Sequence, residues 1–270
     1  MNYDLDKYRE FGKQFEEYLR PSAFPIAIKL IKSEKEIPSD SKRPNIDLKL
    51  QNFLCQNFKM ARTYGWTIAV TEKDCACKLA RAMYGWDPLN EETINFANKF
   101  SVGLYSKDIE TAKKWFECLH ILKNEYIGLV ISPLTRTKIE PDVVQIYCNP
   151  AQLMRLIQAY LYFKGGILEF TAAGRGGSCH DGVIKTLIRD EPQVVLLGNG
   201  DRVWGGAEDS EVMFSIPKNK IEIVIDGLKA THEAGLRYPI PKYMNYNPGF
   251  QVSFQKKAIK RAGGTIVKNK

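Results

Sequence analysis

The cysteines are the residues of this chain whose chemistry is most specific. The segment GRGGSCHDGV, residues 174 to 183, places Cys179 and His180 after a run of glycines and before an apolar stretch, and DCAC, residues 74 to 77, holds Cys75 and Cys77. A thiolate binds thiophilic metals and attacks electrophiles, and its reactivity depends on the thiol pKa. The sequence therefore predicts a site built around cysteines.

Our main hypothesis is that Cys55, Cys75 and Cys179 come together and bind an iron–sulfur cluster or another thiophilic metal. Cys148 or Cys77 would be the fourth ligand, or the fourth position would stay open for a substrate. A site with three thiolates and an open position can act as a Lewis acid, whereas a fully thiolate-ligated cluster suits electron transfer. The chain has no CxxC pair, so the zinc-ribbon and ferredoxin signatures are absent.

A second hypothesis makes Cys179 the nucleophile of a thiol-dependent enzyme, with His180 or His120 as its base. Adjacent residues at the start of a helix usually point in different directions. Cys179 and His180 are therefore a poor catalytic pair unless the glycine-rich loop bends sharply. His180 is otherwise a metal ligand, a hydrogen-bond donor to a ligand, or a solvent-facing side chain.

A third hypothesis is a non-catalytic module that binds a small molecule in a cleft. Gly176 and Gly177 allow close backbone approach to a cofactor, and Arg175 and Arg202 could pair with an anionic group. The alternative is that these glycines form only a tight strand-to-helix turn. The segment 198–211, GNGDRVWGGAEDSE, lacks the GxGxxG spacing and the P-loop lysine, so we expect a loop at the edge of the cleft rather than a nucleotide site.

Two cysteines have plainer interpretations. Cys118 shares a helical face with Trp115, Leu119 and Leu122, which predicts a buried core thiol. Cys148 ends an apolar strand, where either a core position or a site at the carboxyl end of the strand fits the sequence.

Apolar periodicity and turn residues predict the elements that must position these cysteines. The expected helices are one that runs to about Leu19 and those at 48–63, 74–85 with Asp74 as N-cap, 108–122, 150–163 with Pro150 in the first turn, and 183–188. The expected strands cover 24–31, 66–70, 126–134, 139–148, 167–173, 193–198 and 211–217. The predicted fold class is α/β or α+β, with mixed sheets flanked by helices.

The order of helix, glycine, strand, cysteine and helix occurs twice, which suggests an internal duplication. In this alignment Cys75 corresponds to Cys179, and the chain forms two similar lobes, 1–140 and 141–270, packed as one compact unit. Both cysteines would start a helix, whose N-terminus lowers a thiol pKa, and both would face one cleft between the lobes. A chance match of common α/β units is the alternative.

Composition restricts the classes of function. With 44% hydrophobic and 26% charged residues the chain has the composition of a globular protein. Its net charge is +8, but much of the excess lies in residues 255–270, so nucleic-acid binding is not expected. The charged N-terminus lacks the apolar core of a signal peptide, and no window predicts a membrane span. We therefore expect a cytoplasmic protein with reduced thiols and a small-molecule or electron-transfer partner; a homo-oligomer is compatible with the sequence.

Six stretches carry a family resemblance: FLCQ (53–56), DCAC (74–77), EPDVVQIYCNPAQLMRL (140–156), GGSCHDGV (176–183), GNGDR (198–202) and EVMFSIP (211–217). In these stretches the chain resembles the uncharacterised ArCR family of archaea and anaerobic bacteria, and the resemblance covers nearly the whole chain. It implies a prokaryotic, mostly anaerobic setting, in which iron–sulfur chemistry is common. Together with the cysteines, this setting favours a metal or cluster with a redox or Lewis-acid role. It assigns no catalytic residues.

Overall fold

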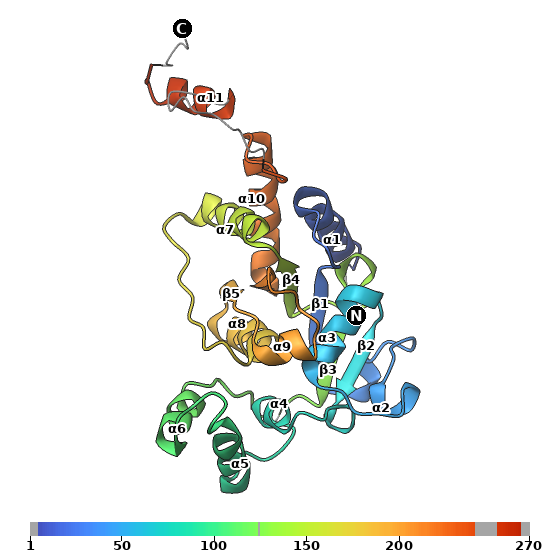
Figure 1. The fold of residues 1–270 in the computed structure, drawn as a ribbon. Helices are drawn as coiled ribbons and strands as arrows, with labels where there is room; N and C mark the ends of the chain where they lie inside the picture. Colours follow the sequence, from blue (N-terminus) through green and yellow to red (C-terminus); the bar gives the residue numbers. More distant parts are fainter. Residues whose placement is uncertain (1–4, 124, 241–252, 266–270) are drawn as a thin grey trace.

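A computed structural model of the chain describes residues 5–123, 125–240 and 253–265. Its centre is a six-stranded sheet in the order β2-β3-β1-β4-β6-β5, in which all neighbouring strands are antiparallel (Figure 1). The strands are β1 (Ile26–Ile31), β2 (Ile68–Thr71), β3 (Gly128–Pro133), β4 (Val143–Cys148), β5 (Gln193–Val195) and β6 (Val212–Pro217). β1 pairs with β4 at the middle, with Ile26 opposite Gln145, so both halves of the chain share one sheet.

Helices cover both faces of the sheet. One face carries α1 (Leu5–Leu19), α7 (Pro150–Lys164) and α10 (Ile221–Glu233), and the other carries α3 (Leu54–Tyr64), α4 (Lys78–Met83) and the π-helix η4 (Gly177–Lys185). Alternation along β1 supplies both cores: Ala27 packs in the core under α1, whereas its neighbours Ile26 and Ile28 pack in the core under α3. The sheet is therefore the middle of three layers.

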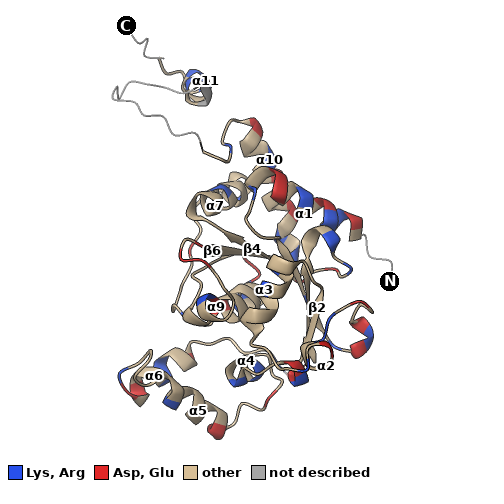
Figure 2. Ribbon diagram, turned by 45° about the vertical axis from the view of Figure 1, so that its right-hand side comes forward, with Lys and Arg blue, Asp and Glu red and all other residues tan. Residues whose placement is uncertain are grey.

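The other described elements lie around these layers. They are α2 (Pro44–Asp47), α5 (Glu91–Ser101), α6 (Ile109–Glu117), α8 (Thr186–Arg189), α9 (Asn199–Val203), α11 (Ser253–Arg261) and the 3-10 turns η1 (Glu34–Glu36), η2 (Glu72–Asp74), η3 (Leu134–Arg136) and η5 (Lys218–Lys220). α5 and α6 lie together near α4, away from the sheet (Figure 1). Charged residues of both signs occupy the outer helices and loops (Figure 2). No helix in the described ranges is long and apolar enough to cross a membrane.

Local capping explains the position of α7, which the sequence predicts well. The Asn149 side chain accepts a hydrogen bond from the Gln152 N–H at 2.9 Å, and the Gln152 side chain accepts one from the Asn149 N–H at 2.8 Å. Pro150 lies in the first turn, and Gly165, with φ of 70°, ends the helix. α1 likewise ends at Leu19, as predicted.

The helix expected over 48–63 is wrong at its start, because a contact distant in sequence interrupts it. α3 begins only at Leu54, since Asn52 forms a parallel bridge with Cys75. The Asn52 N–H donates to the Asp74 carbonyl, and the Asn52 carbonyl accepts from the Ala76 N–H, both at 3.0 Å. This bridge holds the chain just before α3 against the segment that carries two of the cysteines.

Two further elements differ from expectation. The helix expected from Asp74 starts at Lys78 with Cys77 as its N-cap, because the Asp74 carboxylate accepts from the Thr71 N–H instead. Residues 167–173, expected as a strand, form none, and most of their side chains are exposed. The chain there runs over the surface without a neighbouring strand.

The expected mixed sheets are also wrong, because both halves of the chain contribute three strands to one antiparallel sheet. Strands from the ranges 1–140 and 141–270 pair directly at β1 and β4, and the division into two lobes at this boundary stays a prediction. The duplication is not confirmed in the proposed alignment, since residues 167–173 would have to match β2 and are not a strand. Residues 266–270 of the basic C-terminal segment lie outside the described residues.

Candidate functional site

Four cysteines gather on the α3 side of the sheet. In every pair among Cys55, Cys75, Cys77 and Cys179, the charge of one thiolate raises the pKa of another. Coupling of this kind requires that the sulfurs lie near one another. We call these four residues the cysteine cluster. The structure thus brings together the three cysteines of the main hypothesis, and Cys77 rather than Cys148 joins them.

Each member of the cysteine cluster lies at or near the start of a helix. Cys55 is the second residue of α3, and Cys179 is the third residue of η4. Cys77 caps α4, and its sulfur accepts a hydrogen bond from the Ala80 N–H at 3.4 Å. The Cys75 thiol donates to the Cys77 carbonyl at 3.8 Å. The dipoles at the N-termini of these helices favour negative charge on nearby sulfurs.

Burial nevertheless favours the protonated thiols. It raises the pKa of Cys55 and of Cys75 to about 12, and it raises the pKa of Cys179 well above the ordinary value. Burial also raises the pKa of Cys77, and this effect is larger than the lowering of the pKa by the hydrogen bond from the Ala80 N–H. The expectation of lowered pKa values at Cys75 and Cys179 is therefore wrong, because loss of hydration outweighs the helix N-terminus.

Asp201, on α9, is a buried acidic neighbour of the cluster that the sequence analysis missed. Its carboxylate accepts hydrogen bonds from the Gly198 N–H at 2.9 Å, from the Ser178 N–H at 3.3 Å and from the Ser178 hydroxyl. Asp201 raises the pKa of Cys55 and of Cys179 more than any other charged group does, second only to burial. Burial raises the pKa of Asp201 itself. The segment expected as a loop begins with this short helix, and an aspartate three residues after a glycine cap was the signal for it.

Cys148 lies on the other face of the sheet. Its neighbour Tyr147 packs on the face of the cysteine cluster, whereas Cys148 packs in the core under α1 and α7, as adjacent residues of a strand must. Burial, followed by the charge of Glu211, raises the pKa of Cys148 to about 12. Cys118, expected in the core, is exposed, because α6 ends at Glu117 and Cys118 caps it.

His180 is buried with both ring nitrogens engaged. Its Nε2 accepts a hydrogen bond from the His120 backbone N–H at 3.0 Å, so Nδ1 carries the proton and donates to Asp181 at 2.9 Å. The ring of His120 lies 5.8 Å from that of His180, and burial lowers the pKa of His120. His180 thus ties the chain after α6 to η4, and neither of its nitrogens is free for Cys179.

The two arginines expected to contact a ligand make contacts within the chain. Arg175 stacks on the ring of Trp115, 3.6 Å from its centroid, and donates to the Ser101 hydroxyl at 3.0 Å. These contacts attach α5 and α6 to the loop before η4. Arg202 donates to the Glu211 carbonyl at 3.4 Å. Anion binding by either arginine stays a prediction.

Gly176 and Gly177 form the tight start of η4. Gly176 is its N-cap, with φ of 70°. A Cβ at Gly177 would lie 2.5 Å from Oδ2 of Asp201, so the glycine permits α9 to approach η4. The close approach observed here is between two parts of the chain; contact of these glycines with a cofactor is a prediction.

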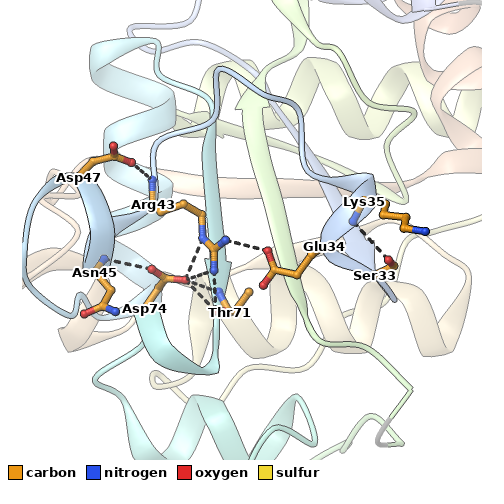
Figure 3. Close-up of polar contacts among 8 residues, drawn as sticks. All are labelled: Ser33, Glu34, Lys35, Arg43, Asn45, Asp47, Thr71 and Asp74. Atoms are coloured by element: carbon orange, nitrogen blue, oxygen red, sulfur yellow. Dashed lines mark hydrogen bonds and ion pairs between the residues drawn. The ribbon is translucent and has the colours of Figure 1, made fainter.

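A polar network around Asp74 anchors the DCAC segment (Figure 3). The buried Asp74 carboxylate accepts hydrogen bonds from the Thr71 N–H at 2.9 Å, from the Asn45 N–H at 3.0 Å and from the Arg43 guanidinium at 3.1 Å. Arg43 in turn pairs with Glu34 at 2.9 Å. The network fixes the backbone just before the two cysteines of this segment.

No group of three or more His, Cys, Asp or Glu side chains in the described part of the chain is arranged to hold a metal ion. The cysteine cluster and Asp201 nevertheless bring sulfur and oxygen donors to one region, in which Cys75 and Asp201 are buried and the other three cysteines are partly exposed. The side chains of Cys75, Cys77 and Asp201 form hydrogen bonds within the chain, to the Cys77 carbonyl, from the Ala80 N–H and from Ser178 and Gly198, respectively.

Comparison with known proteins identifies the family without an activity. The sequence model of the uncharacterised ArCR family matches residues 14–227, which include all six cysteines and Asp201. An uncharacterized protein of Methanocaldococcus jannaschii is 28% identical over 227 residues, which cover 84% of this chain and 95% of that protein. No solved structure matches the chain significantly. The chain therefore belongs to the uncharacterised ArCR family.

Proposed function

We propose that the protein binds a thiophilic metal ion or an iron–sulfur cluster at the cysteine cluster. The observation that carries this proposal is that Cys75, Cys77 and Cys179, from two stretches far apart in sequence, pack in one core, and that Cys55 lies in the first turn of α3, which packs on the same core. Cysteines that serve only as small core residues are not expected to lie close together. Cysteines that bind the same cation must lie close together.

The donor set fits such a group. Cysteine thiolates are the usual ligands of structural zinc and of iron–sulfur clusters. Metal binding removes the thiol protons, and the cation offsets the buried negative charge that otherwise keeps these pKa values high. The described side chains form no group arranged to hold a metal ion, so binding requires a rearrangement of the cluster.

The number of sulfur ligands would decide the role of the site. Ligation by four thiolates suits electron transfer with a redox partner, and three thiolates with an exchangeable position suit a Lewis acid that acts on a small molecule. Either role depends on reduced thiols, in line with the cytoplasmic and anaerobic setting proposed for the protein.

A thiol-dependent enzyme with Cys179 as nucleophile has less support. Burial raises the pKa of Cys179, whereas a nucleophilic cysteine is activated by a lowered pKa or an adjacent base. Both nitrogens of His180 are hydrogen-bonded elsewhere.

The test is the ultraviolet–visible spectrum and the iron, sulfide and zinc content of protein purified without oxygen. Cys55→Ser and Cys179→Ser change the cluster, and Cys118→Ser and Cys148→Ser are matched controls outside it. We expect bound metal in the wild type and in both controls, and its loss from both cluster variants. Equal metal content in all four variants, or a wild type that takes up neither iron nor zinc, would contradict the proposal.

A further inference from the structure

The C-terminal part of the chain carries its entire net charge. Residues 234–270 contain eight Lys and Arg and no Asp or Glu. The other 31 Lys and Arg are balanced by the 31 Asp and Glu of the chain, so residues 1–233 have no net charge. The family model matches residues 14–227 and ends before this segment. The excess charge therefore lies outside the stretch that the family model matches.

The helix α11 presents half of this charge to solvent. Its nine residues, SFQKKAIKR, include Lys256, Lys257, Lys260 and Arg261 and no acidic residue. All four cationic side chains are exposed. α11 lies apart from the three layers of the fold in both Figure 1 and Figure 2, and Figure 2 draws its basic residues in blue.

The four cations share one face of α11. Lys256 and Lys260 are four residues apart, and so are Lys257 and Arg261. Residues at this spacing are neighbours on a helix surface. At 3.6 residues per turn the four side chains span an arc of about 140° around the helix axis. The helix therefore has a continuous basic face.

No contact within the described part of the chain neutralises this face. No Asp or Glu there lies within 4.0 Å of any of the four cations as an ion-pair partner. The helix dipole favours Lys260 and Arg261, which lie in the last turn, but not Lys256 and Lys257, which precede it. Like charges four residues apart repel each other, and a bound polyanion would relieve this repulsion.

The side of α11 opposite the cations is too small to enter a membrane. It holds Ala258 and Ile259, and Ile259 is half-buried. The helix ends in a turn at Gly263 (φ 77°), where the Gly264 N–H donates to the Ile259 carbonyl at 2.8 Å. A Cβ at Gly264 would lie 2.9 Å from Cγ2 of Ile259, so this turn packs against the isoleucine. Helices that bind membranes need a broad apolar face, whereas phosphate contacts need only the cations.

We infer that α11 binds the phosphate backbone of double-stranded DNA without preference for sequence. A helix is about 10–12 Å wide and enters the major groove of B-form DNA, about 12 Å wide, but not the deep and narrow major groove of duplex RNA. Lys and Arg contacts to phosphates position a protein without reading the bases.

Nucleic-acid binding is not expected from the net charge alone. The inference departs from that expectation because the structure arranges four of the cations on one exposed helical face. It does not depend on the proposed metal site, since α11 contributes no residue to the cysteine cluster.

The test is the fluorescence anisotropy of labelled DNA duplexes of two unrelated sequences, titrated with the full chain at several salt concentrations. Both duplexes should bind equally. The α11 variant combines Lys256→Gln, Lys257→Gln, Lys260→Gln and Arg261→Gln. It should bind more than about tenfold more weakly at low salt. Its plot of log K against log salt should be shallower by roughly 3.6, because each phosphate contact contributes about 0.9 to the slope.

The matched control combines Lys73→Gln, Lys99→Gln, Lys113→Gln and Lys114→Gln, four exposed lysines outside the C-terminal segment. Both variants lower the net charge by the same amount, but the control should keep the wild-type affinity and slope. Both should also keep the wild-type thermal stability, because none of the eight side chains belongs to either hydrophobic core. Cys55→Ser should bind DNA as the wild type does, which separates this inference from the metal site.

A wild type that does not bind the duplexes would overturn the inference, and so would equal losses of affinity in the α11 variant and the control. Tighter binding to an RNA duplex would exclude DNA as the partner. Vesicles that contain phosphatidylglycerol should capture little protein at the same phosphate concentration. Capture by these vesicles as strong as that by DNA would instead assign α11 to a lipid surface.

Discussion

Cys148 is a buried thiol apart from the cysteine cluster. Its burial should lower the stability of the folded chain at high pH. Burial, then the charge of Glu211, raises its pKa from 9.0 to about 12. A group whose folded-state pKa is raised contributes stability that is complete below its unfolded pKa and is lost as the pH rises through the folded pKa. The stability due to Cys148 should therefore fall between pH 9 and pH 12, by at most about 1.4 kcal/mol for each pH unit.

Cys148→Ala should flatten this fall in the free energy of unfolding, measured in urea at several pH values across that range. The exposed Cys118→Ala is the control and should keep the wild-type slope. A Cys148→Ala slope equal to that of the wild type would show that the thiol is not buried as described.

His180 supports the fold through its two hydrogen bonds, to Asp181 and from the His120 N–H. His180→Ala leaves these two partners without their contacts, and we expect a loss of about 1–3 kcal/mol in the free energy of unfolding. The metal content and the thiol pKa of Cys179 should not change. Loss of bound metal with unchanged stability would instead place His180 in the site.

At the scale of an element, the network around Asp74 holds the DCAC segment in place. Arg43→Ala leaves the buried Asp74 carboxylate without its cation, and we expect a loss of about 3 kcal/mol. The exposed pair of Lys138 and Asp40 is the matched comparison, and Lys138→Ala should cost less than about 1 kcal/mol. Urea unfolding of both variants measures the difference, and equal losses would contradict the role of Arg43.

Elements governed by local signals could be predicted from the sequence, and those governed by distant contacts could not. α7 carries its own cap at Asn149 and its own stop at Gly165. The start of α3 depends on the bridge from Asn52 to Cys75. This contact joins two segments that are distant in sequence, and the hydrophobic pattern of either segment alone cannot reveal it. Residues 167–173 have the apolar composition of a strand but no strand beside them.

The same distinction holds for the site. Cys55, Cys75 and Cys179 could be chosen as candidates because cysteine chemistry is specific, and their binding of a metal stays a prediction. Strand alternation could have separated Cys148 from Tyr147, since adjacent residues face opposite sides. Asp201 was missed because its cap resembles that of any short helix until the fold brings α9 next to η4.

At the scale of the whole molecule, one antiparallel sheet joins both halves of the chain through β1 and β4. The cysteine cluster combines α3 and the DCAC segment from the first half with η4 from the second. A cation bound there would hold the two halves together beyond the strand pairing. Metal binding should therefore stabilise the folded chain as a whole.

The measurement that tests this account most directly is the free energy of unfolding of metal-free protein, without oxygen, in the absence and presence of Zn²⁺. The account predicts a stabilisation of about 2.7 kcal/mol when free Zn²⁺ is 100 times the dissociation constant, absent from Cys55→Ser and Cys179→Ser and kept in Cys118→Ser. An unfolding free energy that does not change with Zn²⁺ or Fe²⁺, or that changes equally in all three variants, would contradict a metal site at the cysteine cluster.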